Sequence, residues 1–195
     1  MADGEAWCAV WQGSLPGSDV PVYFLEHDAL FGTDELYAGE GTRWGLARFV
    51  LLSRAAFNLA RQIRFDVDVF HVHDWPTAWL PIMLNESELG FEGAASVLTI
   101  HNMAHQPRFD LADYDLTRLP KSLLRSDGVE DYGQLNPMKG GLYHATKITT
   151  VSPTYAQEIR SAPGGAGLED VLAFRGGDLV GIVDGIDEAV WHTVR

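Results

Sequence analysis

Residues 68–84 decide the fold and read DVFHVHDWPTAWLPIML. The residues from Val67 to His73 are rich in β-branched and aromatic side chains, a composition typical of a strand. Pro76 follows within three residues, and proline suits the first turn of a helix because its missing N–H would have no partner there. The stretch therefore predicts a strand over residues 67–73 and a helix from about Pro76 to Leu84, the alternation that builds an α/β fold.

The same alternation of strand and helix continues on both sides of this stretch. We predict further strands over residues 21–25, 96–100, 148–151 and 179–183, and further helices over residues 44–64, 136–145 and 168–174, with another beginning at Pro153. Residues 103–134 show no regular pattern. Short, continuous apolar strands predict a sheet covered on both faces. The sequence thus predicts an α/β domain over residues 20–195, with a doubly wound and mainly parallel sheet, after an irregular lead over residues 1–19.

The composition excludes several classes of function. Twenty-seven acidic against fourteen basic residues give a net charge of −13. That charge repels phosphate backbones and anionic lipid, so we expect neither a nucleic acid nor a membrane as a partner. Cys8 is the single cysteine, which excludes an internal disulfide. The apolar runs break before the roughly 18 residues that a transmembrane helix needs, and no secretory signal is visible.

Polar residues follow four of the predicted strands, at the edge where a parallel sheet binds its ligands. These residues are His73, Asp74, His101, Asn102, Ser152 and Asp184. Ser152 stands before a proline and is predicted to be a helix N-cap, and Asp184 with the glycine after it equally fits a turn. His101 and Asn102 need hydrogen-bond partners after a buried strand, which a ligand could supply.

Two other patterns have competing interpretations. His71 and His73 lie on one face of a strand, a spacing that can chelate a divalent metal. We predict instead that His71 points into the packed layer, that His73 alone approaches the edge, and that no metal is bound. A metal-dependent hydrolase built on this pair is the alternative. Lys139, Gly140 and Gly141 could hold an anion or mark close packing of the backbone. No phosphate-binding glycine loop follows a strand, and we expect no cofactor.

Six segments carry a resemblance to a known family. They are VYFLEHDALF (22–31), RFVLLSRAAFNLA (48–60), DVFHVHDWPTAWLPIML (68–84), SVLTIHNMAHQ (96–106), NPMKGGLYHATKITTVSPTYAQEI (136–159) and GLEDVLAFRGGDLVGIVDGIDEAVW (167–191). From about residue 20 onward, the chain resembles the N-terminal half of bacterial glycogen synthases and plant starch synthases. The resemblance implies a Rossmann-like domain, the first half of a GT-B glycosyltransferase. It also implies retaining transfer of glucose from ADP-glucose to the non-reducing end of an α-1,4-glucan, in a bacterial cytoplasm or a plant plastid.

The resemblance implies roles for individual residues. Asp74, His101 and Asn102 would line the sugar end of the donor site, with His101 as the catalytic residue. Tyr37 would reach the same cleft, and Asp184 stands where the family usually has asparagine. A neutral or cationic imidazole can donate a hydrogen bond toward a sugar oxygen as charge develops during the reaction.

Departures from the family pattern limit the activity that we expect. No lysine-glycine-glycine loop is visible before residue 20, and we expect the second domain, with its diphosphate-binding cations and essential glutamate, to be absent. The chain alone is therefore predicted to be inactive, and a non-catalytic carbohydrate-binding remnant is the alternative. Without a partner domain, we expect the apolar Trp75 and Met103 to be exposed beside the site.

Overall fold

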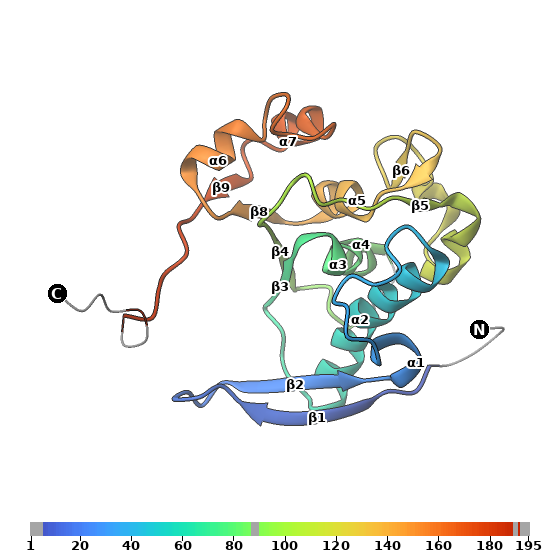
Figure 1. Cartoon of the computed structure of the whole chain (residues 1–195), viewed down its shortest axis with the longest axis vertical. Helices are drawn as coiled ribbons and strands as arrows, with labels where there is room; N and C mark the ends of the chain where they lie inside the picture. The colour runs from blue at the N-terminus through green and yellow to red at the C-terminus, as the bar shows by residue number, and fades with distance from the viewer. Residues whose placement is uncertain (1–5, 87–89, 189–190, 192–195) are drawn as a thin grey trace.

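The computed structural model describes residues 6–86, 90–188 and 191, and a four-stranded parallel sheet forms its centre (Figure 1). The strands lie in the order β3 (Val69–His73), β4 (Ala95–Ile100), β8 (Lys147–Thr150) and β9 (Leu179–Gly181). His73 pairs with Thr99 and Thr99 with Thr149, so neighbouring strands end side by side at one edge. The predicted α/β class with a parallel sheet is confirmed.

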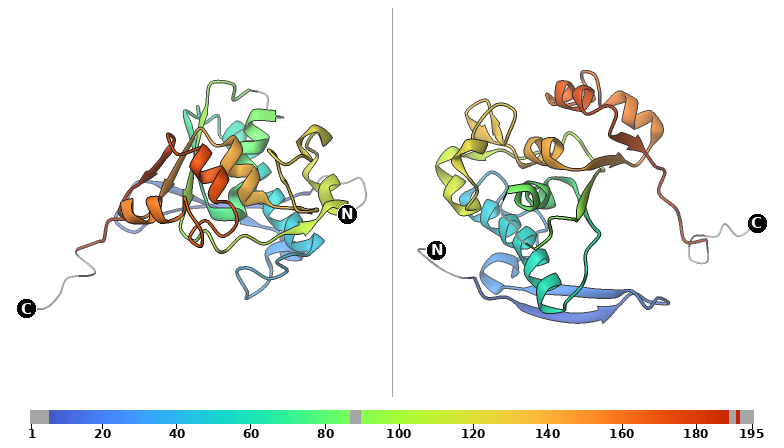
Figure 2. Two further views of the ribbon diagram at one scale, coloured as in Figure 1. Left: turned by 90° about the horizontal axis from the view of Figure 1, so that it is seen from above. Right: turned by 180° about the vertical axis from the view of Figure 1, so that it is seen from behind.

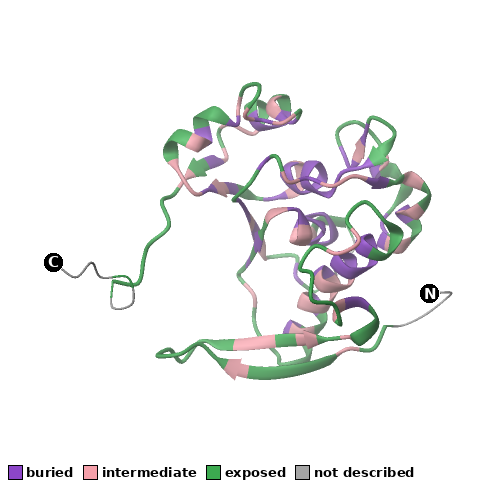
Figure 3. Ribbon diagram, in the orientation of Figure 1, coloured by how far each residue is buried: buried purple, intermediate pink, exposed green. Residues whose placement is uncertain are grey.

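Helices pack against one face of this sheet. Figure 1 shows α2 (Arg43–Gln62), α3 (Asp74–Thr77), α4 (Trp79–Glu86) and α5 (Pro137–His144) on one side of β3 and β4, with α6 (Pro153–Glu158) and α7 (Glu169–Phe174) beside β8 and β9. Val72, Leu98 and Ile148 point into this layer and are buried. The buried residues gather in the central sheet and these helices (Figure 3).

The opposite face of β3 is open in the described part of the chain. Residues along β3 alternate between exposed and buried, with Val69, His71 and His73 exposed. The prediction that the strands are covered on both faces is therefore wrong for β3. Its composition resembles that of a strand buried on both faces because only the two histidines interrupt the apolar run, and imidazoles occur in both environments.

The first thirty residues differ from their predictions. Residues 9–14 of the expected irregular lead form β1 (Ala9–Ser14), which pairs antiparallel with β2 (Pro21–Glu26). The strand predicted over residues 21–25 is confirmed as β2, but its predicted burial is wrong, since this hairpin stands apart from the parallel sheet (Figure 2) and is largely exposed. β-Branched and aromatic residues favour strands in either environment, so composition alone did not distinguish them. Residues 1–5 of the lead lie outside the described residues.

Short elements complete the fold. They are α1 (Asp28–Phe31), a three-stranded antiparallel sheet of β5 (Phe109–Asp110), β7 (Gln134–Leu135) and β6 (Glu130–Asp131), and the 3₁₀ helices η1 (Leu111–Thr117) and η2 (Lys121–Leu123). Most of them fall in the stretch over residues 103–134 that shows no regular sequence pattern. Within the described ranges, no helix combines the length and the apolar character needed to cross a membrane.

Candidate functional site

Asp74 ties the ends of two strands together. It follows β3 directly and has a backbone φ of 52°, in the left-handed region that aspartate tolerates better than most residues. Its Oδ1 accepts hydrogen bonds from the backbone N–H of His101 at 2.7 Å and of Asn102 at 3.4 Å. Because His101 and Asn102 follow β4, this carboxylate fixes the geometry at the carboxyl edge of the sheet.

The imidazoles at the same edge are also in contact. Nδ1 of His73 lies 3.0 Å from Nε2 of His101, and both histidines are exposed when the whole residue is considered. The side-chain oxygen of Asn102 accepts the backbone N–H of Ala104 at 3.0 Å, which leaves its amide N–H₂ group available for a ligand. We call His73, Asp74, His101 and Asn102 the strand-end cluster. Of the five site residues that the family resemblance implied, the structure brings together three, Asp74, His101 and Asn102.

The other two predicted residues lie at the margin of the cluster. The Tyr37 ring is 6.0 Å from the Trp75 ring and 4.7 Å from the His105 ring, measured between centroids, so it approaches the cluster through Trp75. Asp184 is exposed after β9, and its charge favours the protonated form of His73. Among the hydrogen bonds of the described residues, none joins Asp184 to the cluster.

Desolvation is the main cause that lowers the pKa of His73 below its ordinary value of 6.5. The neighbouring rings of His71 and His101 lower it further, while the carboxylates of Asp74 and Asp184 act in the opposite direction. His73 is therefore neutral near pH 7, and a neutral imidazole donates from one nitrogen and accepts at the other.

His71 does not point into the packed layer, so that prediction is wrong. Its ring is exposed and stacks on His73 with 4.4 Å between centroids. Nε2 of His71 lies 2.6 Å from Oγ1 of Thr99, which lies 2.6 Å from Oγ1 of Thr149. Sequence reasoning did not find the two threonines. Their signal is strand register, which places Thr99 beside His73 and Thr149 beside Thr99 only once the strands are paired.

Trp75 and Met103 are 1% and 0% exposed, so the prediction that they lie open beside the site is wrong. The Trp75 ring packs edge-on against Phe49 of α2 with 4.5 Å between centroids. The backbone N–H of Met103 donates to the hydroxyl of Tyr155. The apolar residues next to the cluster are thus core residues of this chain.

The patterns at Ser152 and at residues 139–141 are structural. Ser152 caps α6 by accepting a hydrogen bond from the Tyr155 N–H, as predicted. Lys139 is buried and its Nζ donates to the Glu130 carbonyl at 2.7 Å, and a Cβ on Gly140 would meet side chains at 2.6 Å. Close packing, and not an exposed anion site, accounts for this segment.

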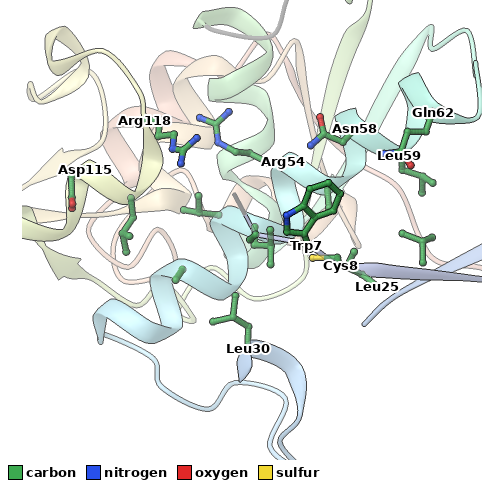
Figure 4. A pocket seen from close by; sticks show the side chains of 17 residues that line it. Trp7, Cys8, Leu25, Leu30, Arg54, Asn58, Leu59, Gln62, Asp115 and Arg118 are labelled. Carbon is green, nitrogen blue, oxygen red and sulfur yellow. The ribbon is translucent and has the colours of Figure 1, made fainter. Parts of the chain in front are cut away.

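A separate cavity of about 610 Å³ lies between the hairpin and α2 (Figure 4). Trp7 and Leu25 line one side of it, and Leu51, Arg54 and Asn58 of α2 line the other. No member of the strand-end cluster borders this cavity. Over the described residues, no three His, Cys, Asp or Glu side chains are grouped so as to hold a metal ion.

Comparison with known families identifies the domain. The family model for the starch synthase catalytic domain matches residues 1–174. The chain belongs to this family. The match to the family model includes residues 1–19. The family similarity therefore begins earlier than the sequence motifs, which begin at about residue 20.

Individual relatives agree with this assignment. The chain is 44% identical over 194 residues to Glycogen synthase 1 from Geobacter sulfurreducens, covering 97% of this chain and 39% of that protein. It is 41% identical over 185 residues to Glycogen synthase from Thermodesulfovibrio yellowstonii, of which it covers 37%.

A solved structure of a relative confirms the fold of this chain. The catalytic domain of Starch Synthase IV from Arabidopsis thaliana, bound to ADP and acarbose, matches with a TM-score of 0.83 and 32% identity. The match covers 97% of this chain and 39% of that one. The predicted Rossmann-like half of a GT-B glycosyltransferase is confirmed, and the chain spans about two fifths of the length of these relatives.

Proposed function

We propose that this chain supplies one half of the donor site for transfer of glucose, with retention, from ADP-glucose to the non-reducing end of an α-1,4-glucan. The observation that carries the proposal is the strand-end cluster, in which one Asp74 oxygen holds the backbone of both His101 and Asn102. The matching starch synthase structure is described as bound to ADP and acarbose, which supports a nucleotide and a glucan as ligands.

The cluster offers both kinds of group that sugar hydroxyls require. Among the described residues, Asp74 uses Oδ1 for its hydrogen bonds, which leaves Oδ2 to accept from a hydroxyl. Asn102 presents its amide N–H₂ as a donor. His101 donates from its ring to a sugar oxygen and holds the sugar in place while the bond to the diphosphate breaks, with the bonding electron pair and the negative charge going to the leaving diphosphate. In this proposal His101 is the catalytic residue and Asp74 both binds and positions.

The residues at the margin adjust binding. Tyr37 bounds the sugar end of the cleft through its contact with Trp75. Asp184 adds a negative charge near an anionic donor, which weakens attraction to the diphosphate. The chain alone carries a net charge of −13, and its cluster contains no arginine or lysine to stabilise the leaving group. We therefore propose that the chain transfers no glucose unless the rest of a synthase is present.

A chimera tests this function. The matched segment of the Geobacter sulfurreducens relative is replaced by this chain, and label transfer from ADP-glucose to glycogen is measured. We expect transfer by the chimera and none by the chain alone. A His101→Ala substitution in the chimera should lower the rate by about 10²-fold or more. A His27→Ala substitution, which removes a histidine outside the cluster, is the matched control.

The outcomes separate the alternatives. Release of the incorporated label by β-amylase is expected for an α-1,4 product, and a preference for UDP-glucose would contradict the proposed donor. A folded chimera that binds glycogen but transfers no glucose would favour the alternative interpretation of this chain as a non-catalytic carbohydrate-binding remnant. Equal transfer rates for the chimera and its His101→Ala variant would show that His101 is not the catalytic residue.

A further inference from the structure

A row of three imidazoles lies on the open face and edge of the sheet. His71 and His73 project from the same face of β3 and stack with 4.4 Å between ring centroids. The row continues across the sheet to His101, whose Nε2 lies 3.0 Å from Nδ1 of His73. The catalytic ring of the proposed mechanism is therefore in direct contact with a second ring that has no assigned role.

The row is anchored at its other end by hydroxyl groups. His71 is bonded to Thr99, and Thr99 to Thr149 of the next strand, each at 2.6 Å. These contacts fix the plane of the His71 ring, and stacking on His71 restricts the His73 ring. The partner that His101 meets is accordingly held in place by the sheet.

The contact between His73 and His101 restricts where protons sit. A hydrogen bond between two imidazole nitrogens needs a proton on one and a lone pair on the other. In histidine, the hydrogen bond made by one ring nitrogen sets which nitrogen is protonated. A donor at Nδ1 of His73 leaves Nε2 of His101 as the acceptor and places the proton of a neutral His101 on its Nδ1.

We propose that His73 is a positioning residue that fixes the His101 ring and holds it as the Nδ1–H tautomer, so that His101 presents a hydrogen-bond donor to a sugar oxygen. The part of this inference that concerns the sugar rests on the proposed function. The part that concerns the tautomer starts from the 3.0 Å contact of the two rings and assigns the shared proton to Nδ1 of His73.

The charges around His73 support this arrangement. The groups that face it are the rings of His71 and His101 and the carboxylates of Asp74 and Asp184. Desolvation and the two rings lower the pKa of His73 more than the two carboxylates raise it. A neutral His73 can share one proton with His101, whereas two imidazolium rings at this distance would repel each other.

Nuclear magnetic resonance of the ¹⁵N-labelled chain tests the tautomer without any substrate. Two-bond ¹H–¹⁵N correlations of the imidazoles are recorded at pH 7.5, and the His101 signals are assigned by their loss in His101→Ala. We expect a protonated-type shift at Nδ1 and an unprotonated-type shift at Nε2. Substitution His73→Leu should move both shifts toward averaged, intermediate values.

Two further variants separate positioning from general disturbance. His73→Asn keeps a polar group at the place of Nδ1 and should restore most of the wild-type shifts of His101. His71→Leu, on the same strand and face, loosens the His73 ring but keeps its contact with His101, so it should move the shifts less than His73→Leu does. The proposal is overturned if the wild-type shifts are already averaged, if they show the Nε2–H tautomer, or if His73→Leu leaves them unchanged. Because no nucleotide sugar is used, these results are independent of whether the chimera transfers glucose.

Discussion

Substitution of Asp74 separates two contributions to stability that coincide at one residue, a hydrogen bond and a left-handed backbone. The N–H of His101 is 2.7 Å from Oδ1, a short bond, whereas that of Asn102 is 3.4 Å away and contributes less. A hydrogen bond to a charged group contributes about 1.5–3 kcal/mol, and because His101 is exposed to water we take the lower end, about 1.5 kcal/mol. The φ of 52° costs an alanine roughly 1 kcal/mol and costs a glycine nothing.

These contributions predict an order of variants. Asp74→Asn keeps an acceptor oxygen and tolerates the left-handed backbone, so its free energy of unfolding should fall by less than about 1 kcal/mol. Asp74→Gly loses the bond, and its relief of strain is offset by the greater entropy of the unfolded chain, which gives a loss of about 1.5 kcal/mol. Asp74→Ala loses the bond and strains the backbone, for a total of about 2.5 kcal/mol.

Urea unfolding followed by tryptophan fluorescence measures the three free energies. Equal losses for Asp74→Gly and Asp74→Ala would refute the contribution of the backbone. A loss for Asp74→Asn as large as that for Asp74→Gly would refute the hydrogen bond between the strand ends. The same three proteins in the chimera would show whether loss of activity follows loss of this bond.

Three further predictions follow from other parts of the chain. A Cβ at position 140 would lie only 2.6 Å from neighbouring side chains, so Gly140→Val should lower the free energy of unfolding, measured in urea, by about 1–3 kcal/mol. Gly177→Ala, at a position with open space, should change it little. Burial lowers the pKa of His144 below 6.5, so the unfolded ring binds a proton more readily, and the urea midpoint should fall as pH drops below 6.5 but less steeply in His144→Gln. The exposed hairpin residues Trp11 and Phe24, 62% and 59% exposed, should promote self-association as salt screens the charge of −13. Sedimentation should show a monomer at low salt and larger species at physiological salt, and Trp11→Gln with Phe24→Gln should abolish them; a wild-type monomer at both salt concentrations would contradict the reasoning.

Much of the parallel sheet could be predicted from short stretches of sequence. The strand over residues 96–100 and the Ser152 cap are specified locally, by β-branched residues and by a serine before proline. The rule that ligands bind at the carboxyl edge then indicated Asp74, His101 and Asn102 before any coordinates were known. The structure places these three together because successive parallel strands end at the same edge.

The exposure of side chains could not be predicted in the same way. Trp75 and His71 are two examples, because one is buried and the other exposed against prediction. Local sequence states which residues form a strand or a helix, but burial depends on what packs against each face from distant parts of the chain. For Trp75 the decisive neighbour is Phe49 of α2, more than twenty positions away.

The sequence by itself determined the α/β alternation, the family and the residues at the strand ends, since propensities, caps and motifs act over a few neighbouring positions. The tertiary structure alone decided that β1 and β2 form a separate hairpin, that the Asp74 carboxylate holds His101, and that His73 contacts the His101 ring. The separate hairpin depends on β1 and β2 pairing with each other and not with the parallel sheet. The two contacts of His101 depend on strand register and join residues about 27 positions apart in the chain. Such contacts form only when the whole chain packs, because the free energy that selects them comes from burial and pairing across the sheet.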